Sequence, residues 1–129
     1  MEGLLYLHQR NIAHRDIKLE NIMFVSDDED ELAIKVIDFG FACEFDPEEG
    51  MSLVLGSPLY MAPEIVTGQT YTEKVDVWAL GILTYVLVQG TQHFDTQSVK
   101  AIYQNTVFKT FSFKAQCWDC ISADMKNFI

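Results

Sequence analysis

Residues 14–21 carry side chains that together could transfer a charged group. The sequence places an acid at Asp16, a base at Lys18 and an amide at Asn21, in a stretch that we expect to be an extended loop. A positioned carboxylate can take the proton of an incoming hydroxyl, a contribution worth roughly 10²–10⁴ in rate. A nearby ammonium can stabilise negative charge that develops during a reaction. Asp16 and Lys18 are therefore the candidate catalytic residues.

A second acid could complete a metal site. Asp38 follows Asn21 by 17 residues and comes directly after a predicted strand, as Asp38-Phe39-Gly40. Asn21 offers an uncharged oxygen and Asp38 a charged one, and such hard ligands suit Mg²⁺. Either acid alone would be an ordinary turn or capping residue. Further on, residues 56–64 read Gly-Ser-Pro-Leu-Tyr-Met-Ala-Pro-Glu.

The rest of the chain must supply the elements that position these side chains. The pattern of apolar residues predicts the end of a helix closing near residues 9–10 and a pair of strands, 22–25 and 33–37, joined by an acidic turn at 27–31. Residues 38–64 have little periodicity, and such a long loop is uncommon unless it is functional or disordered. Helices are predicted over 72–89 with Thr72 as N-cap, near 97–105, and after Ser122. The first of these is apolar nearly all round and must be buried on most sides.

Composition limits the class of protein. The chain has 129 residues, of which 49% are hydrophobic, and this suits one packed domain or a piece of one. Its formal net charge is −10, all of it within residues 1–64, which argues against nucleic-acid and membrane partners. The three cysteines, an odd number, indicate a reducing compartment, so we expect a cytoplasmic or nuclear protein.

Two patterns lack the partners that a metal site needs. The acidic run 27–31 has neither the alternating oxygen ligands nor the central Gly of an EF-hand. Cys117 and Cys120 form a lone Cys-x-x-Cys pair. A zinc site would need a second ligand pair, and a thioredoxin-type motif would need its own βαβ unit. His93 is interpreted as a loop residue rather than a ligand.

The ordered motifs at 14–21, 38–40 and 56–64 resemble those of the eukaryotic protein kinases. Residues 76–81, Asp-Val-Trp-Ala-Leu-Gly, are similar to the central helix of the kinase C-terminal lobe. Lys18 and Ser57 are typical of Ser/Thr kinases. The C-terminal third, from Phe113 through Trp118 to residues 126–129, resembles the calcium/calmodulin-dependent and calcium-dependent kinase group. Residues 90–94 depart from that group because they lack its prolines.

This resemblance implies a fold that is mainly α with a small β-hairpin. Residues 1–129 would form part of a kinase C-terminal lobe that is incomplete at both ends. No Gly-rich loop, strand Lys or helix Glu precedes His14, so the N-terminal lobe is expected as a missing partner. The parent protein would transfer the γ-phosphate of ATP to Ser or Thr hydroxyls of proteins, with Mg²⁺. The isolated 129-residue chain is expected to be inactive and poorly stable.

The resemblance also implies roles at the nucleotide and substrate sites. Asp16 would be the base, Lys18 would contact the transferring phosphoryl group, and Asn21 and Asp38 would hold the metal. Met23 matches the residue that packs beneath the adenine. Glu20 would bind an Arg of the substrate, which predicts basic residues beside the acceptor.

Other positions are carried over as regulatory or structural. Arg15 would pair with a phosphate on the activation segment, where Ser52 is a candidate acceptor. Relatives often have a Thr one position later, where this chain has Leu53, so we favour activity that does not depend on a Ser52 switch. The remaining roles are a bond from Ser57 to Asp16 and Lys18, a pairing of Glu64 with a downstream Arg, and a stack of His14 and Phe39 anchored by Asp76.

One alternative is a different class of protein, a non-catalytic kinase-like fragment that acts as a binding or scaffold module. The four intact residues Asp16, Lys18, Asn21 and Asp38 favour catalysis, because a binding module has no chemical need for all of them. The missing nucleotide-binding lobe favours the alternative. An in-frame Gly-rich loop and Lys upstream of Met1 would decide between them.

Overall fold

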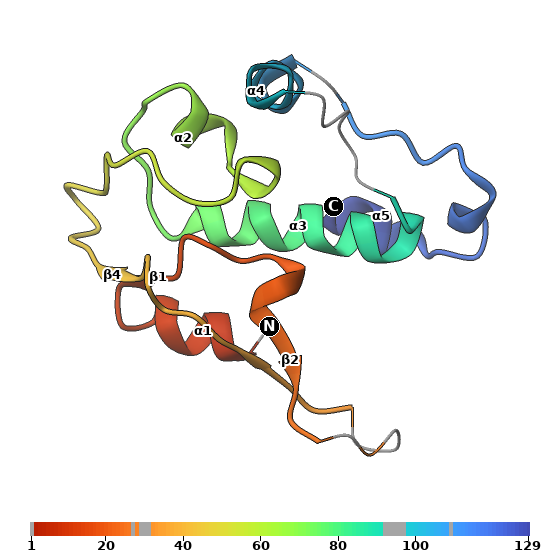
Figure 1. Ribbon diagram of the computed structural model, residues 1–129, viewed down its shortest axis with the longest axis horizontal. Coiled ribbons are helices and arrows are strands. Elements are labelled where there is room, and N and C mark those ends of the chain that lie inside the picture. Colours follow the sequence, from red (N-terminus) through yellow and green to blue (C-terminus); the bar gives the residue numbers. More distant parts are fainter. Residues whose placement is uncertain (1, 27, 29–31, 92–97, 109) are drawn as a thin grey trace.

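The computed structural model describes residues 2–26, 28, 32–91, 98–108 and 110–129, with helix α3 (Lys74–Gln89) running through the middle (Figure 1). The prediction of Thr72 as N-cap is wrong. Glu73 holds that position without a side-chain capping bond, so the helix begins two residues after Thr72. The predicted end at Gln89 is confirmed, because Gly90 follows in the left-handed conformation, with φ of 73°.

Helix α1 (Glu2–His8) and a hairpin lie on one side of α3 (Figure 1). The hairpin consists of β2 (Ile22–Phe24) and β3 (Ile34–Val36), which pair antiparallel with Ile22 opposite Val36. This pairing confirms the predicted strands. Of the acidic turn between them, only Asp28 is among the described residues. The core on this side of α3 is formed by Leu4, Ile17, Ala79 and Leu83.

The segment that follows the hairpin, residues 37–73, begins on the same side of α3 as α1 and ends on the other side (Figure 1). It contains β4 (Cys43–Glu44), which pairs with β1 (Ile12–Ala13), the 3₁₀ turn η2 (Pro58–Tyr60) and the short helix α2 (Pro63–Val66). Met51 and Tyr71 form an isolated antiparallel bridge that ties the middle of this segment to the chain before α3. The core here comprises Ala13, Phe45, Met51, Met61, Ala62, Ile65, Tyr71 and Val75.

The C-terminal third wraps the end of α3. It contains α4 (Val99–Phe108), the 3₁₀ turn η3 (Gln116–Trp118) and α5 (Ala123–Phe128). The helix predicted after Ser122 is confirmed, with Ser122 accepting the backbone N–H of Met125 as its cap. Helix α4 matches the one predicted near 97–105 but extends to Phe108. Residues 92–97, with His93 and Gln97, the first residue predicted for that helix, lie outside the described residues.

The described part of the chain is thus mostly helical with two small antiparallel sheets. The β1–β4 pair was not predicted, because two-residue strands are too short to show an alternating pattern. None of the helices among the described residues is long and apolar enough to span a lipid bilayer.

Candidate active site

Asp76 on α3 fixes the loop that carries the candidate catalytic residues. Its Oδ2 accepts the backbone N–H of His14 at 2.8 Å, and its Oδ1 accepts that of Arg15 at 2.8 Å. The His8 Nε2 lies 2.9 Å from Oδ2 as a further partner. Asp76 is fully buried, so its carboxylate is stable there only because these partners replace water.

Arg15 lies at a turn of the backbone between His14 and Asp16. Its φ of 65° lies in the left-handed region, which is uncommon for a residue other than glycine and is held here by surrounding contacts. The Arg15 Nε donates to the carbonyl oxygen of Phe41 at 2.7 Å, and Nη1 donates to the Tyr71 hydroxyl at 3.4 Å. The guanidinium therefore already has partners in the segment that follows β3.

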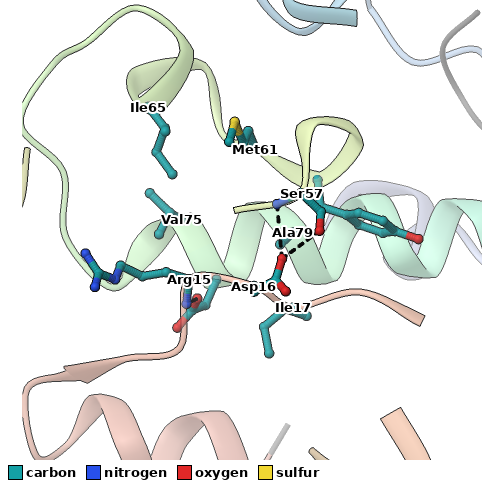
Figure 2. Close-up of a pocket in the computed structure, with 10 residues that line it drawn as sticks. Arg15, Asp16, Ile17, Ser57, Met61, Ile65, Val75 and Ala79 are labelled. Carbon is teal, nitrogen blue, oxygen red and sulfur yellow. Dashed lines mark hydrogen bonds between the residues drawn. The ribbon is translucent and has the colours of Figure 1, made fainter. Parts of the chain in front are cut away.

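The carboxylate of Asp16 lies at the centre of a hydrogen-bond network. Its Oδ1 accepts both the backbone N–H of Ser57, at 3.0 Å, and the Ser57 hydroxyl, at 2.7 Å (Figure 2). Its Oδ2 accepts from Lys18 Nζ at 2.7 Å and from Asn21 Nδ2 at 3.1 Å. Lys18 Nζ also donates to the Ser57 hydroxyl at 2.9 Å. The structure thus brings Asp16, Lys18, Asn21 and Ser57 together.

This network controls the charge of both ionisable groups. Burial works to raise the pKa of Asp16, but hydrogen bonds from Lys18, Ser57 and Asn21 and the charge of Lys18 outweigh it, and the pKa lies below the usual range. The hydrogen bond to Asp16 raises the pKa of Lys18, with further contributions from the charges of Glu20 and Asp38. Asp16 is therefore an anion and Lys18 a cation at neutral pH.

Gly56 permits the close approach of the two segments. Its φ is 113°, and a Cβ at this position would lie 2.7 Å from the carbonyl oxygen of Arg15. A larger residue would push residues 56–57 away from the loop and pull the Ser57 N–H off Asp16. Glycine is required here by both conformation and space.

The hairpin brings the two candidate metal ligands to one end. Asn21 precedes β2 and its carbonyl oxygen accepts the backbone N–H of Ile37, so Asp38 follows directly after the residue that faces Asn21. Asp38 is exposed, has φ of 60°, and uses Oδ1 to accept the N–H of Gly40. Among the described residues, the Asn21 Oδ1 and the Asp38 Oδ2 accept no hydrogen bond. One neutral and one charged oxygen are thus available, a donor set that fits Mg²⁺.

The predicted stack of His14 and Phe39 is present as an edge-to-face contact. The ring centroids are 5.0 Å apart with an interplanar angle of 62°. His14 is fully buried, and its Nε2 lies 3.2 Å from the carbonyl oxygen of Ile37. Asp76 anchors this stack through the His14 backbone N–H. Phe39 and Met23 are about half exposed, at 49% and 54%.

The other predicted residues lie around this centre. Glu20 is exposed on the turn η1 (Leu19–Asn21), close enough to Lys18 to affect its pKa. Ser52 is exposed in the segment between Asp38 and Glu64. Glu64 is half-buried on α2, and among the described residues its carboxylate makes no hydrogen bond or ion pair.

Three residues of the site escaped sequence reasoning. No sequence pattern indicated a role for His8 or Tyr71, because their partners are far away in sequence. The Tyr71 hydroxyl donates to the carbonyl oxygen of Leu53 at 2.6 Å and accepts a hydrogen bond from Arg15 Nη1. Gly56 preceded Ser57 in a recognised motif, and its place there was the only signal of its role.

Comparison with known proteins identifies the family of this chain. Residues 1–129 match the family described as the protein kinase domain. The chain belongs to the protein kinase family.

Individual kinases are similar along nearly the whole chain. It is 36% identical to Serine/threonine-protein kinase zyg-8 of Caenorhabditis elegans, over 99% of this chain and 16% of that protein. It is 38% identical to Calcium-dependent protein kinase 5 of Plasmodium berghei, over 98% of this chain and 22% of that protein. It is 41% identical to Serine/threonine-protein kinase ATG1b of Arabidopsis thaliana, over 97% of this chain and 17% of that protein.

These matches confirm the predicted family and the resemblance to Ser/Thr kinases, including calcium-dependent ones. The chain spans 16% to 36% of the length of the curated relatives it matches. In the kinase family, a loop with an Asp and an Asn and a separate Asp-Phe-Gly motif form one phosphoryl-transfer site. This chain has the same residue types at Asp16, at Asn21 and at residues 38–40.

Proposed function

We propose that this chain provides the catalytic part of a protein kinase that transfers the γ-phosphate of ATP to Ser or Thr hydroxyls of proteins. The observation that carries the proposal is the shared carboxylate of Asp16, which is held by Ser57, Lys18 and Asn21 at once. A scaffold module would gain nothing from holding an anion, a cation and two polar groups within hydrogen-bond distance of one another.

Asp16 would orient the acceptor hydroxyl and receive its proton. Because its pKa lies below the usual range, the carboxylate is a weak base, suited to accept a hydrogen bond early and the proton late in the transfer. Phosphoryl transfer tolerates this, since its loose transition state demands positioning and charge stabilisation more than early deprotonation. The Ser57 hydroxyl would keep the carboxylate aimed at the acceptor.

Lys18 would stabilise the charge on the transferring phosphoryl oxygens. Its raised pKa keeps it cationic, and its bond to Ser57 holds it beside Asp16. Asn21 and Asp38 would hold Mg²⁺ through the two oxygens that no described residue uses. When bound, the ion would supply positive charge that offsets the negative charge of the phosphates.

The substrates would be proteins with basic residues beside the acceptor. Glu20 is exposed near Lys18, and residues 1–64 carry the whole net charge of −10. Such a field attracts basic peptides to the site. The protein would act inside the cell, in the cytoplasm or nucleus.

Activity would not depend on a phosphate at Ser52. Arg15 already donates to the carbonyl oxygen of Phe41 and to the Tyr71 hydroxyl, so its guanidinium is ordered without an added anion. We expect Ser52→Ala to keep the activity of the wild type. A large loss of activity in this variant would assign a phosphorylation switch to Ser52.

A peptide-library assay on the full-length natural protein tests the proposal. Each peptide carries one Ser, Thr or Tyr acceptor and either basic or acidic flanks, with Mg-ATP as the phosphate donor. We expect transfer to Ser and Thr and a preference for basic flanks. Absence of transfer to any peptide or protein would contradict the kinase proposal, whereas acidic preference would contradict only the role of Glu20.

A further inference from the structure

Cys117 and Cys120 are two exposed thiols on a single turn. The turn η3 ends at Trp118, and Asp119 keeps helical backbone with φ of −65° and ψ of −33°, so Cys120 follows directly after the turn. Trp118 and Asp119 donate their backbone N–H groups to the carbonyl oxygens of Ala115 and Gln116. Side chains three residues apart eclipse one another in a 3₁₀ turn. In agreement, the Cys120 Sγ donates to the carbonyl oxygen of Cys117 at 3.7 Å. The Cys120 thiol is thus turned back toward Cys117.

Trp118, between the two cysteines, anchors this turn to α3. The indole is fully buried, and its centroid lies 5.0 Å from that of Tyr85 and 4.8 Å from that of Phe113. Its Nε1 donates to Gln89 Oε1 at 3.0 Å. The turn is thus held firmly on its buried side, and both thiols remain at the surface.

We propose that Cys117 and Cys120 form a redox-modification site that closes into an intramolecular disulfide on reaction with a small-molecule disulfide such as oxidised glutathione. One cysteine thiolate attacks a sulfur of the small disulfide, forming a mixed disulfide and releasing one small thiolate. The second cysteine attacks the protein sulfur of the mixed disulfide and releases the other. The protein pair loses two electrons and two protons, and the small disulfide becomes two thiols.

The geometry of the turn makes this bond reachable but strained. A 3₁₀ rise of about 2.0 Å per residue puts Cα atoms three residues apart at about 6 Å, inside the range of roughly 4.4–6.8 Å for disulfides. The Cβ atoms of such residues are about 5–6 Å apart, and a disulfide requires about 3.5–4.5 Å. The turn must tighten by roughly 1–2 Å between the Cβ atoms, and strained disulfides are readily reduced. The modification is therefore reversible.

Cys43 provides the matched control because its surroundings differ. It lies on β4, is only partly exposed, and its Sγ donates to Met51 Sδ at 3.3 Å.

The Cys-x-x-Cys pair lacks the second ligand pair of a zinc site and the βαβ unit of a thioredoxin-type motif. A disulfide between the two cysteines needs neither of these.

The test follows the thiols of the full-length natural protein in glutathione buffers of increasing oxidised fraction. After acid quenching and alkylation, the tryptic peptide 115–126 contains both Cys117 and Cys120 and is read by mass spectrometry. We expect oxidation to block alkylation of both cysteines and to give the mass of an internal disulfide. Cys117→Ser and Cys120→Ser should each abolish that species, and Cys43→Ser should keep it.

Three results would overturn the site: both cysteines alkylated at every ratio, separate glutathione adducts without the internal bond, or a bridge to Cys43. A second measurement uses phenylarsine oxide, whose trivalent arsenic is held by two converging thiols. It should protect both cysteines of the reduced wild type from alkylation. It should not protect the remaining cysteine of Cys117→Ser or of Cys120→Ser. Failure to protect the wild type would show that the thiols do not converge.

Discussion

Ser57 makes two hydrogen bonds to one oxygen of Asp16, from its backbone N–H at 3.0 Å and from its hydroxyl at 2.7 Å. The same hydroxyl accepts from Lys18. A residue 41 positions away in the chain thus holds the carboxylate in one orientation and connects the anion to the cation. The site is complete only when residues 56–57 lie against the loop, a position that Gly56 permits.

The bridging hydroxyl of Ser57 should contribute to turnover. Ser57→Ala keeps the backbone bond but removes the side-chain contacts to Asp16 and Lys18. Hydrogen bonds to charged groups are worth about 1.5–3 kcal/mol, so we expect turnover of the full-length protein to fall by about 10–100-fold. Ser57→Thr keeps the hydroxyl and should retain most activity. Steady-state kinetics of the two variants decide, and equal losses would show that the hydroxyl is not responsible.

The lowered pKa of Asp16 sets the sign of a pH effect on stability. The folded state binds the Asp16 proton more weakly than the unfolded state does, so the carboxylate stabilises the fold above its ordinary pKa. This contribution is lost as the pH falls below about 4 toward the folded-state pKa. Ser57→Ala removes one cause of the lowered pKa. The free energy of unfolding of this variant should therefore fall further below that of the wild type at pH 7 than in acid.

Urea unfolding of wild type and Ser57→Ala at several pH values measures that deficit. The exposed Ser52, substituted to Ala, serves as the control with no expected pH dependence. A Ser57→Ala deficit that grows as the pH falls would contradict the account of the Asp16 pKa.

Asp76 should matter for folding more than any exposed acid. In Asp76→Asn only the amide oxygen can accept hydrogen bonds, because the second oxygen is replaced by an NH₂ group. The buried backbone N–H of either His14 or Arg15 therefore loses its partner. We expect a loss of about 2–4 kcal/mol in the free energy of unfolding. Asp119→Asn, at an exposed carboxylate, should stay within about 0.5 kcal/mol. Denaturant unfolding gives both values, and similar effects for the two would contradict the anchoring role.

Some of these relationships could be predicted from the sequence and others could not. The spacing of Asp16, Lys18 and Asn21 is local, and the hairpin strands have a clear apolar pattern. The Asp76 bond to the His14 N–H joins residues 62 positions apart, and no local pattern shows it. Thr72 has a residue type that favours an N-cap, yet Glu73 holds that position without a side-chain bond, so residue type alone gave the wrong start for α3. No sequence pattern indicated a role for Tyr71, and only the contacts of its hydroxyl in the structure reveal one.

The metal ligands should differ in their effect on nucleotide binding. Asp38 is the charged ligand, so Asp38→Ala should weaken Mg-ATP binding at least about tenfold. Asn21→Ala should weaken it less and should also lower turnover, because the Asn21 amide donates to Asp16. Titration of the two full-length variants with Mg-ATP tests this difference. Equal affinities would contradict the assignment of Asp38 as the main ligand.

Turnover of the full-length Asp16→Asn variant tests the central claim most directly. The substitution keeps size and polarity but removes the base that would accept the hydroxyl proton. With Mg-ATP and a Ser peptide we expect turnover to fall by about 10²–10⁴-fold, with nucleotide affinity nearly unchanged. The unfolding midpoint should fall, because the carboxylate with its lowered pKa stabilises the fold, so the variant is assayed at a temperature below its own midpoint. Turnover equal to that of the wild type would show that Asp16 is not the catalytic base.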